Sequence, residues 1–129
     1  MNAVAAIQRA EFLLPGEPAP SGRRDPRWQA IVSVARFVRH EPEAVWEFVD
    51  EWGNHPQEDL REAVASCLVE PLLEFHFDDF FPLVEERTIS DAFFADMFLR
   101  CTRFGQAAEL RNAKRFDALQ RQLAAKFFD

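Results

Sequence analysis

Apolar side chains recur at helical spacing through almost the whole chain after residue 26, and this periodicity constrains the fold more than any other feature. The clearest example runs from Ala92 to Phe104, where apolar and aromatic residues return every three or four positions. Such spacing is typical of helices that bury one face. Because no alternating segment stands alone long enough to form a sheet, the sequence predicts an all-α fold.

Turn-forming residues divide this periodic sequence into separate helices. Glu41-Pro42 separates the first helix of the periodic region from the second, and Gly53-Asn54 ends the second. The next helix contains Pro71, whose ring clashes with the carbonyl four residues back. We expect a kink there and not a break, because the apolar pattern resumes in phase at Leu72.

The last third of the chain predicts two further helices. The first begins at Ala92, after a turn in which Ser90 is a candidate helix cap, and Gly105 is expected to end it. The second covers residues 110–127 and carries a basic outer face. The cations of that face are Arg111, Lys114, Arg115, Arg121 and Lys126.

Residues 72–82 read LLEFHFDDFFP and allow three interpretations: a strand, a metal site, or a corner between two helices. We favour the corner, with Asp78 or Asp79 capping the second helix and Pro82 in its first turn. A metal site would draw on Glu74, His76, Asp78 and Asp79, but no paired histidines or cysteine ligands accompany them. We therefore expect no metal.

Residues 15–26 contain four prolines and two glycines, which predicts a linker. The predicted organisation is a short N-terminal helix over residues 1–14, this linker, and a helical domain over residues 27–129 that ends in the basic helix. The periodic region yields about seven helices in antiparallel hairpins when the N-terminal helix is included.

The charge of the chain is concentrated in its middle. Residues 41–96 carry sixteen carboxylates and only two cations, whereas the segments on either side are net basic. An acidic surface repels phosphate, so nucleic acid is not the expected partner of this region. It attracts a basic protein surface and accelerates the encounter, although acids also occur simply as the solvated outer face of a helix.

The motifs of enzymes are missing from the sequence. No glycine-rich phosphate loop occurs, and Ser33, Ser66 and Ser90 lack the context of a catalytic nucleophile. Cys67 and Cys101 fall on apolar helix faces without metal-type spacing, as buried thiols of a cytoplasmic protein do. No apolar run is long enough to span a membrane. We therefore expect a cytoplasmic protein without catalytic residues or cofactor.

A repeat of helix pairs underlies the pattern. Asp25-Pro26-Arg27 and Asp59-Leu60-Arg61 stand 34 positions apart, and Asp91 opens a third unit. The repeat resembles HEAT-like α-solenoids, and more closely small bacterial HEAT-like proteins related to the DNA-alkylation-repair solenoids. The segments that carry the resemblance are Trp46 to Gly53, Asp59-Leu60-Arg61-Glu62-Ala63, residues 72–78, Phe94-Ala95-Asp96, Phe104-Gly105-Gln106 and residues 112–117.

The resemblance implies a binding scaffold but does not imply a reaction. In the alkylation-repair relatives, tryptophans and an aspartate line a cleft for a damaged nucleotide, and Trp46 and Asp50 lie one turn apart here. That activity needs a cationic surface to hold phosphates, and the surroundings of Asp50 are acidic. We therefore expect Trp46 in the core and Asp50 in solvent.

These observations favour a non-catalytic protein-interaction module with an acidic face, of which an immunity or antitoxin-type protein is one form. The candidate partner-binding residues are Glu43, Glu47, Asp50 and Glu51, which suit another protein with a basic surface. The alternative is a nucleic-acid-binding or DNA-repair-related protein that uses the basic last helix. A third interpretation is a structural domain that oligomerises.

Overall fold

The computed structural model describes residues 2–19 and 24–128, which form helices joined by short connections. No strand occurs in the described ranges, so the predicted all-α class is confirmed. Because α4, η1 and α5 form one continuous helix, these ranges contain seven helices. The bounds are α1 (Ala3–Leu13), α2 (Pro26–Ala35), α3 (Pro42–Trp52), α4 (Glu58–Val64), the π-helical turn η1 (Ala65–Val69), α5 (Glu70–Phe75), α6 (Phe77–Ile89), α7 (Ala92–Leu99), the 3-10 turn η2 (Gly105–Ala108) and α8 (Leu110–Phe127).

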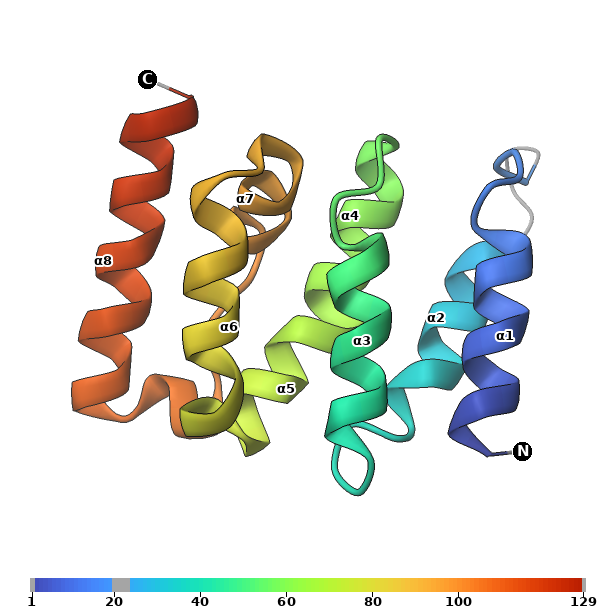
Figure 1. Ribbon diagram of the computed structural model, residues 1–129, viewed down its shortest axis with the longest axis horizontal. Helices are drawn as coiled ribbons and strands as arrows, with labels where there is room; N and C mark the ends of the chain where they lie inside the picture. Colours follow the sequence, from blue (N-terminus) through green and yellow to red (C-terminus); the bar gives the residue numbers. More distant parts are fainter. Residues whose placement is uncertain (1, 20–23, 129) are drawn as a thin grey trace.

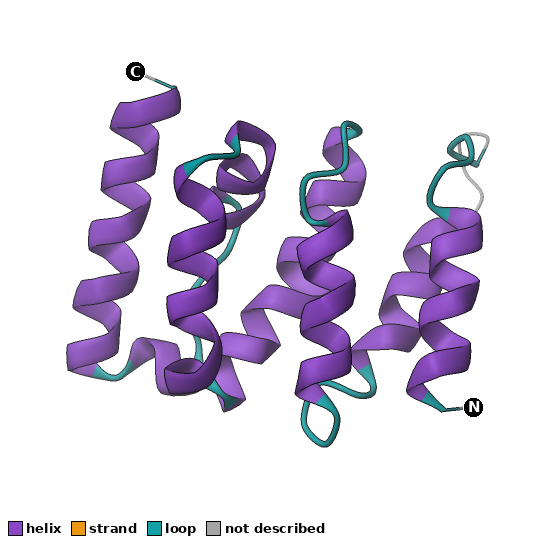
Figure 2. Cartoon of the chain, in the orientation of Figure 1, coloured by secondary structure: helices purple, strands orange, loops and turns teal. Residues whose placement is uncertain are grey.

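The helices form two layers whose order follows the chain. Figure 1 shows α1, α3, α6 and α8 in a front row, with α2, the α4–α5 helix and α7 behind them. Helices of the front row run in one direction and those of the back row in the other, so consecutive helices are antiparallel. Most loops lie at the two ends of the helices (Figure 2). Residues 20–23 of the predicted linker lie outside the described residues.

One apolar core runs between the two layers and includes α1. Ala6, Ala10 and Leu14 of the N-terminal segment are fully buried in it. At the other end the core is aromatic: the rings of Phe77 and Phe81 stack 4.6 Å apart, and Phe98 and Phe116 lie 4.9 Å apart. The four rings are buried, and Phe98 is completely inaccessible to solvent.

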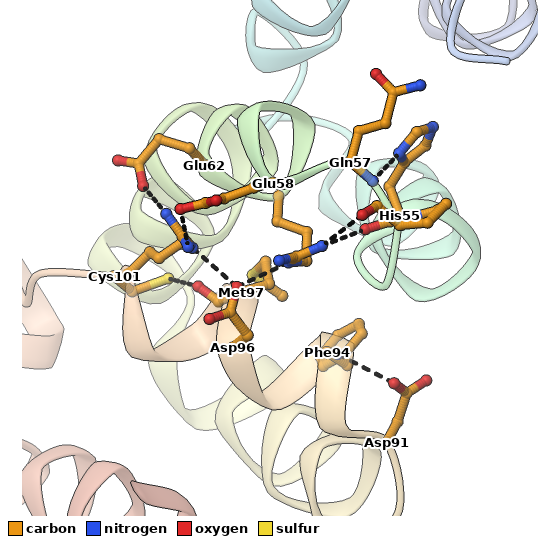
Figure 3. A network of polar contacts seen from close by, with 12 residues as sticks. His55, Gln57, Glu58, Glu62, Asp91, Phe94, Asp96, Met97 and Cys101 are labelled. Carbon is orange, nitrogen blue, oxygen red and sulfur yellow. Dashed lines mark hydrogen bonds and ion pairs between the residues drawn. The ribbon is translucent and has the colours of Figure 1, made fainter. Parts of the chain in front are cut away.

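Buried arginines link each helix pair to the next. Arg27, which is 1% exposed, binds Asp25 beside it and Asp59 of α4, both at 2.7 Å. Arg61 of α4 binds Asp96 of α7, also at 2.7 Å. The same guanidinium donates to the backbone carbonyls of the loop before α4 (Figure 3). A buried guanidinium is costly unless it is paired and hydrogen-bonded, and these arginines meet that condition.

The long second-layer helix is continuous across Pro71 and changes direction between α4 and α5 (Figure 1), as the sequence predicts. The accompanying π turn was not predicted. In it the N–H of Glu70 bonds the carbonyl of Ala65, five residues back. Pro71 has no N–H to donate and crowds the preceding turn, so a wider turn there relieves the clash. The Cys101 thiol lies 3.8 Å from the same Ala65 carbonyl.

The corner in residues 72–82 is confirmed, because His76 alone separates α5 from α6. Its predicted details are wrong: neither Asp78 nor Asp79 is the cap, and Pro82 lies inside α6, beyond the first turn. Instead the Gln106 side chain holds the corner, accepting from the Phe77 N–H and donating to the Phe75 carbonyl, each at 2.9 Å. A residue 29 positions away thus satisfies backbone groups that a local cap was expected to satisfy.

The helix predicted to run from Ala92 to Gly105 ends earlier, at Leu99, and its cap is Asp91 and not Ser90. The Asp91 carboxylate accepts from the Phe94 N–H at 3.1 Å. Gly105 begins η2 instead of ending α7, and its backbone has φ +53°. A side chain there would meet Glu74, so glycine allows both the left-handed conformation and the close approach.

Candidate protein-binding face

Three exposed glutamates follow one side of α3. Glu43, Glu47 and Glu51 are spaced four residues apart, which places them one above another on a helix surface. The opposite side of α3 buries apolar residues, including Phe48 and Val49, and this burial fixes which side faces solvent. Within the described residues no arginine, lysine or histidine forms an ion pair with these three glutamates. We call them the α3 acidic stripe.

Asp50, the fourth predicted site residue, is exposed but paired. Its Oδ1 accepts from Nε of Arg87 on α6 at 2.9 Å, and its backbone carbonyl accepts from Nη2 of the same arginine at 3.3 Å. The Arg87 guanidinium also binds Asp91 at 2.7 Å and lies 4.7 Å from the centre of the Phe94 ring. Asp50 therefore bridges α3 to α6 and is not a free acid like the residues of the stripe.

A groove of about 320 Å³ lies between α3 and α6, next to the stripe. Trp46 forms part of its wall and is half-buried, so the expectation of a tryptophan wholly within the core is met only in part. Its ring packs against Phe80 and Phe94, with centroids 6.2 Å away in both cases. The residues that line the groove are Trp46, Asp50, Leu83, Glu86, Arg87 and Ser90.

Hydrogen bonds set the charge of Asp91, which binds the groove residue Arg87. Burial raises the pKa of Asp91, but hydrogen bonds from Arg87, the Phe94 N–H and Asn54 outweigh it and hold that pKa below its ordinary value. Asp91 is therefore an anion near neutral pH. Because it shares Arg87 with Asp50, the positive charge of that arginine is matched within the protein.

Acids of the back layer contrast with the stripe because arginines of the same chain bind them. Arg100 at the end of α7 binds Glu58, Glu62 and Asp96 at 2.8, 3.2 and 2.9 Å (Figure 3). Burial raises the pKa of Asp96, but hydrogen bonds from Arg100 and Arg61 outweigh this and lower it overall. These ion pairs hold α4 against α7, and each of the three carboxylates already has a bound arginine.

The basic last helix is divided between two roles. Arg115 binds Glu85 of α6 at 3.2 Å, and the Lys126 ammonium donates to the Ile89 carbonyl at 2.6 Å. These contacts place part of the helix's charge against the acidic middle of the same chain. Arg111, Lys114 and Arg121 are exposed, and no ion pair with them occurs in the described ranges.

The residues weighed as metal ligands do not converge. His76 contacts the Arg39 carbonyl at 3.2 Å through Nε2, while Asp78 and Asp79 are exposed on α6. Over residues 2–19 and 24–128, no three histidine, cysteine or acidic side chains are grouped as a metal ion requires. Cys67 and Cys101 are free thiols, and burial raises the pKa of both, which disfavours the reactive thiolate.

Sequence reasoning found the stripe but missed the groove. Arg87 and Glu86 lie in a segment of α6 where nothing in the local pattern marks a site. Arg87 could have been noticed as one of the two cations among sixteen acids, which favours a specific pairing role. Its partner was beyond sequence reasoning, because Asp50 lies 37 residues away.

Comparisons of the chain with family models, curated proteins and solved structures found no match. In the part of the chain that the structure describes, no helix has the length and apolar character needed to cross a bilayer.

Proposed function

We propose that this chain is a non-catalytic protein-binding module whose α3 acidic stripe docks a protein with a basic surface. The observation that carries the proposal is the contrast between two sets of acids. Glu58, Glu62 and Asp96 each bind an arginine of the same chain, whereas the three aligned acids of the stripe form no ion pair with any described residue. Unpaired charges of one sign, grouped on one surface, steer an oppositely charged partner toward it.

The arrangement of helices supports a HEAT-like α-solenoid as the scaffold. Arg27 and Arg61 occupy corresponding positions 34 residues apart, and each binds an aspartate of the following helix pair. Pairs that contact chiefly their neighbours leave one layer open for binding, which is how repeat scaffolds are commonly used. The stripe lies on α3, in the front layer of Figure 1.

A cytoplasmic immunity or antitoxin-type protein fits this proposal. Proteins that neutralise a basic toxin gain from a small size and an acidic surface, and this chain has 129 residues and a net charge of −7. Charge complementarity would give such a complex a rapid association.

The alternative function, nucleic-acid binding, rests on α8. Arg111, Lys114 and Arg121 are exposed there and free of ion pairs within the described ranges. Three cations on one helix give a weak, salt-sensitive affinity for phosphates. The acidic α6 helix packs beside α8, and its carboxylates would repel the phosphates of a long duplex. We therefore rank this function second.

Affinity capture with matched charge reversals tests the proposal. One variant carries Glu43→Lys, Glu47→Lys and Glu51→Lys, and the control variant carries Arg111→Glu, Lys114→Glu and Arg121→Glu. We expect the wild type and the α8 control to retain the same protein from a lysate of the source cells, and the α3 variant to lose it. Equal retention by all three proteins contradicts the proposal. Duplex DNA binding that only the α8 reversal abolishes favours the alternative.

A further inference from the structure

We infer that the groove between α3 and α6 receives an arginine side chain of the docking partner. This inference rests on the proposed function and specifies which chemical group the partner inserts. The groove lies beside the α3 acidic stripe and combines an indole, a leucine and carboxylates, as a long cationic side chain requires. Three of its properties support this occupant.

The first property is a fixed aromatic wall. Phe80 and Phe94 pack against the Trp46 ring and hold its orientation, while part of the ring remains exposed. Among the described residues, Trp52 Nε1 is the only buried side-chain polar atom without a partner. Trp46 Nε1 also has no acceptor among the described residues. Because it is not one of the buried unpartnered atoms, it is accessible to solvent. Tryptophan is the aromatic side chain that attracts a guanidinium most strongly.

The second property is an excess of negative charge. Arg87 is balanced by Asp50 and Asp91, which leaves Glu86 as an exposed carboxylate without an ion pair in the described ranges. Asp50 uses Oδ1 for Arg87, and no contact to its Oδ2 occurs among the described residues. An entering cation therefore finds two carboxylate groups with free acceptor capacity.

The third property is an apolar surface for the stem of the entering side chain. Leu83 is 37% exposed at the groove, and methylene groups of a long cationic side chain cover such a surface while the head reaches the acids. Arginine fits better than lysine, because its planar guanidinium stacks on an indole and bonds a carboxylate in the same plane. A phosphate or carboxylate ligand would meet Glu86 and the nearby stripe, and the groove therefore disfavours anions.

Nuclear magnetic resonance of the indole N–H groups tests the inference without a known partner. The probes are the peptides acetyl-(Gly-Arg)4-amide and acetyl-(Gly-Lys)4-amide, and Trp46→Phe assigns the Trp46 signal among the three tryptophans. We expect the arginine peptide to shift the Trp46 signal saturably and to leave those of Trp28 and Trp52 in place. The lysine peptide should bind about two- to fivefold more weakly, because an ammonium neither stacks on the indole nor bonds a carboxylate in the plane of its stack.

Matched glutamate variants test whether the groove itself binds the peptide. Glu86→Gln should weaken the arginine peptide about two- to fivefold, whereas Glu17→Gln, an exposed control outside the groove, should leave binding unchanged. If the peptide binds but neither the Trp46 signal nor Glu86→Gln responds, the groove inference is wrong and the stripe remains the docking surface. If neither peptide binds and the stripe reversal leaves partner capture intact, the proposed function fails and the inference fails with it.

Discussion

Nε of Arg61 on α4 lies 2.7 Å from Oδ2 of Asp96 on α7, across 35 residues of sequence. The guanidinium is also bonded to the carbonyls of His55 and Pro56, and it lies 4.8 Å from the centre of the Phe93 ring. Arg27 makes the equivalent contact one helix pair earlier, with Asp59. The two contacts fix the register between successive helix pairs, and so they determine where the front-layer helices lie.

Removing the charge of Asp96 should destabilise the protein more than removing that of a surface acid. Asp96→Asn leaves Arg61 buried without its anion, and we expect a loss of about 2–4 kcal/mol in the free energy of unfolding. The control is Asp117→Asn, whose partner Arg103 is 41% exposed, and we expect less than about 1 kcal/mol there. Urea denaturation measures both. Similar losses in the two variants would show that the Arg61–Asp96 pair has no special role.

The aromatic core should be sensitive to truncation of Phe98. Its ring is fully buried between Phe81 and Phe116, so Phe98→Ala should cost about 3–5 kcal/mol in the free energy of unfolding. The matched control is Phe104→Ala, because Phe104 is 48% exposed. We expect this change to lower the free energy of unfolding by less than about 1 kcal/mol. A loss under about 1 kcal/mol for Phe98→Ala would contradict the observed packing.

His55 should make stability depend on pH. Its Nδ1 accepts from the Gln57 N–H, so Nε2 carries the proton and donates to the Leu14 carbonyl, each bond being 3.0 Å long. Burial lowers the pKa of His55 and outweighs the opposing effect of the Leu14 bond. As pH falls below about 6.5, the unfolded chain therefore binds the proton first, and the free energy of unfolding decreases until the folded pKa is passed.

The variant His55→Gln isolates this effect. We expect its stability to be lower than that of the wild type at pH 8 and its dependence on pH between about 7 and 5 to be weaker. Burial raises the pKa of Glu70, which stabilises the folded state as pH falls through part of the same range, but this contribution is common to both proteins. Denaturant midpoints measured across that range provide the comparison. Parallel curves for the two proteins would contradict a neutral, buried His55.

The helical class could be predicted because it depends on local spacing. The apolar periodicity that gives α8 is complete within its own sequence, and its predicted bounds agree with the structure. The matching Asp and Arg pairs at Asp25 and Asp59 were also visible. The sequence did not show which arginine binds which aspartate. Arg27 binds Asp25 beside it and also Asp59 of the next helix pair.

The errors occur where a distant residue decides local structure. α7 was extended to Gly105 because Cys101 and Phe104 continue its apolar spacing, yet the chain leaves the helix after Leu99. The Arg100 side chain then reaches back to the acids of α4. The corner at His76 shows the same effect, because its backbone partner is Gln106 and not a local aspartate.

In the candidate site, too, the features set by local spacing could be predicted and those set by distant residues could not. Exposure of Glu43, Glu47 and Glu51 follows from helical spacing alone, so the stripe could be predicted. Asp50 was grouped with them by charge, but its position one residue off the stripe turns it toward Arg87 of α6. The groove needs both helices in place, and no local sequence pattern contains that information.

The rate of association with the captured partner, measured against ionic strength, tests the central claim most directly. The wild type is compared with the variant that carries Glu43→Lys, Glu47→Lys and Glu51→Lys, whose stability should change by only tenths of a kcal/mol because these side chains are exposed. We predict a slower on-rate for the variant at low salt. The two rates should converge as salt rises and the screening length falls from about 10 Å at 0.1 M to about 3 Å at 1 M. Equal on-rates at low salt would contradict the account and show that the stripe is only solvated surface.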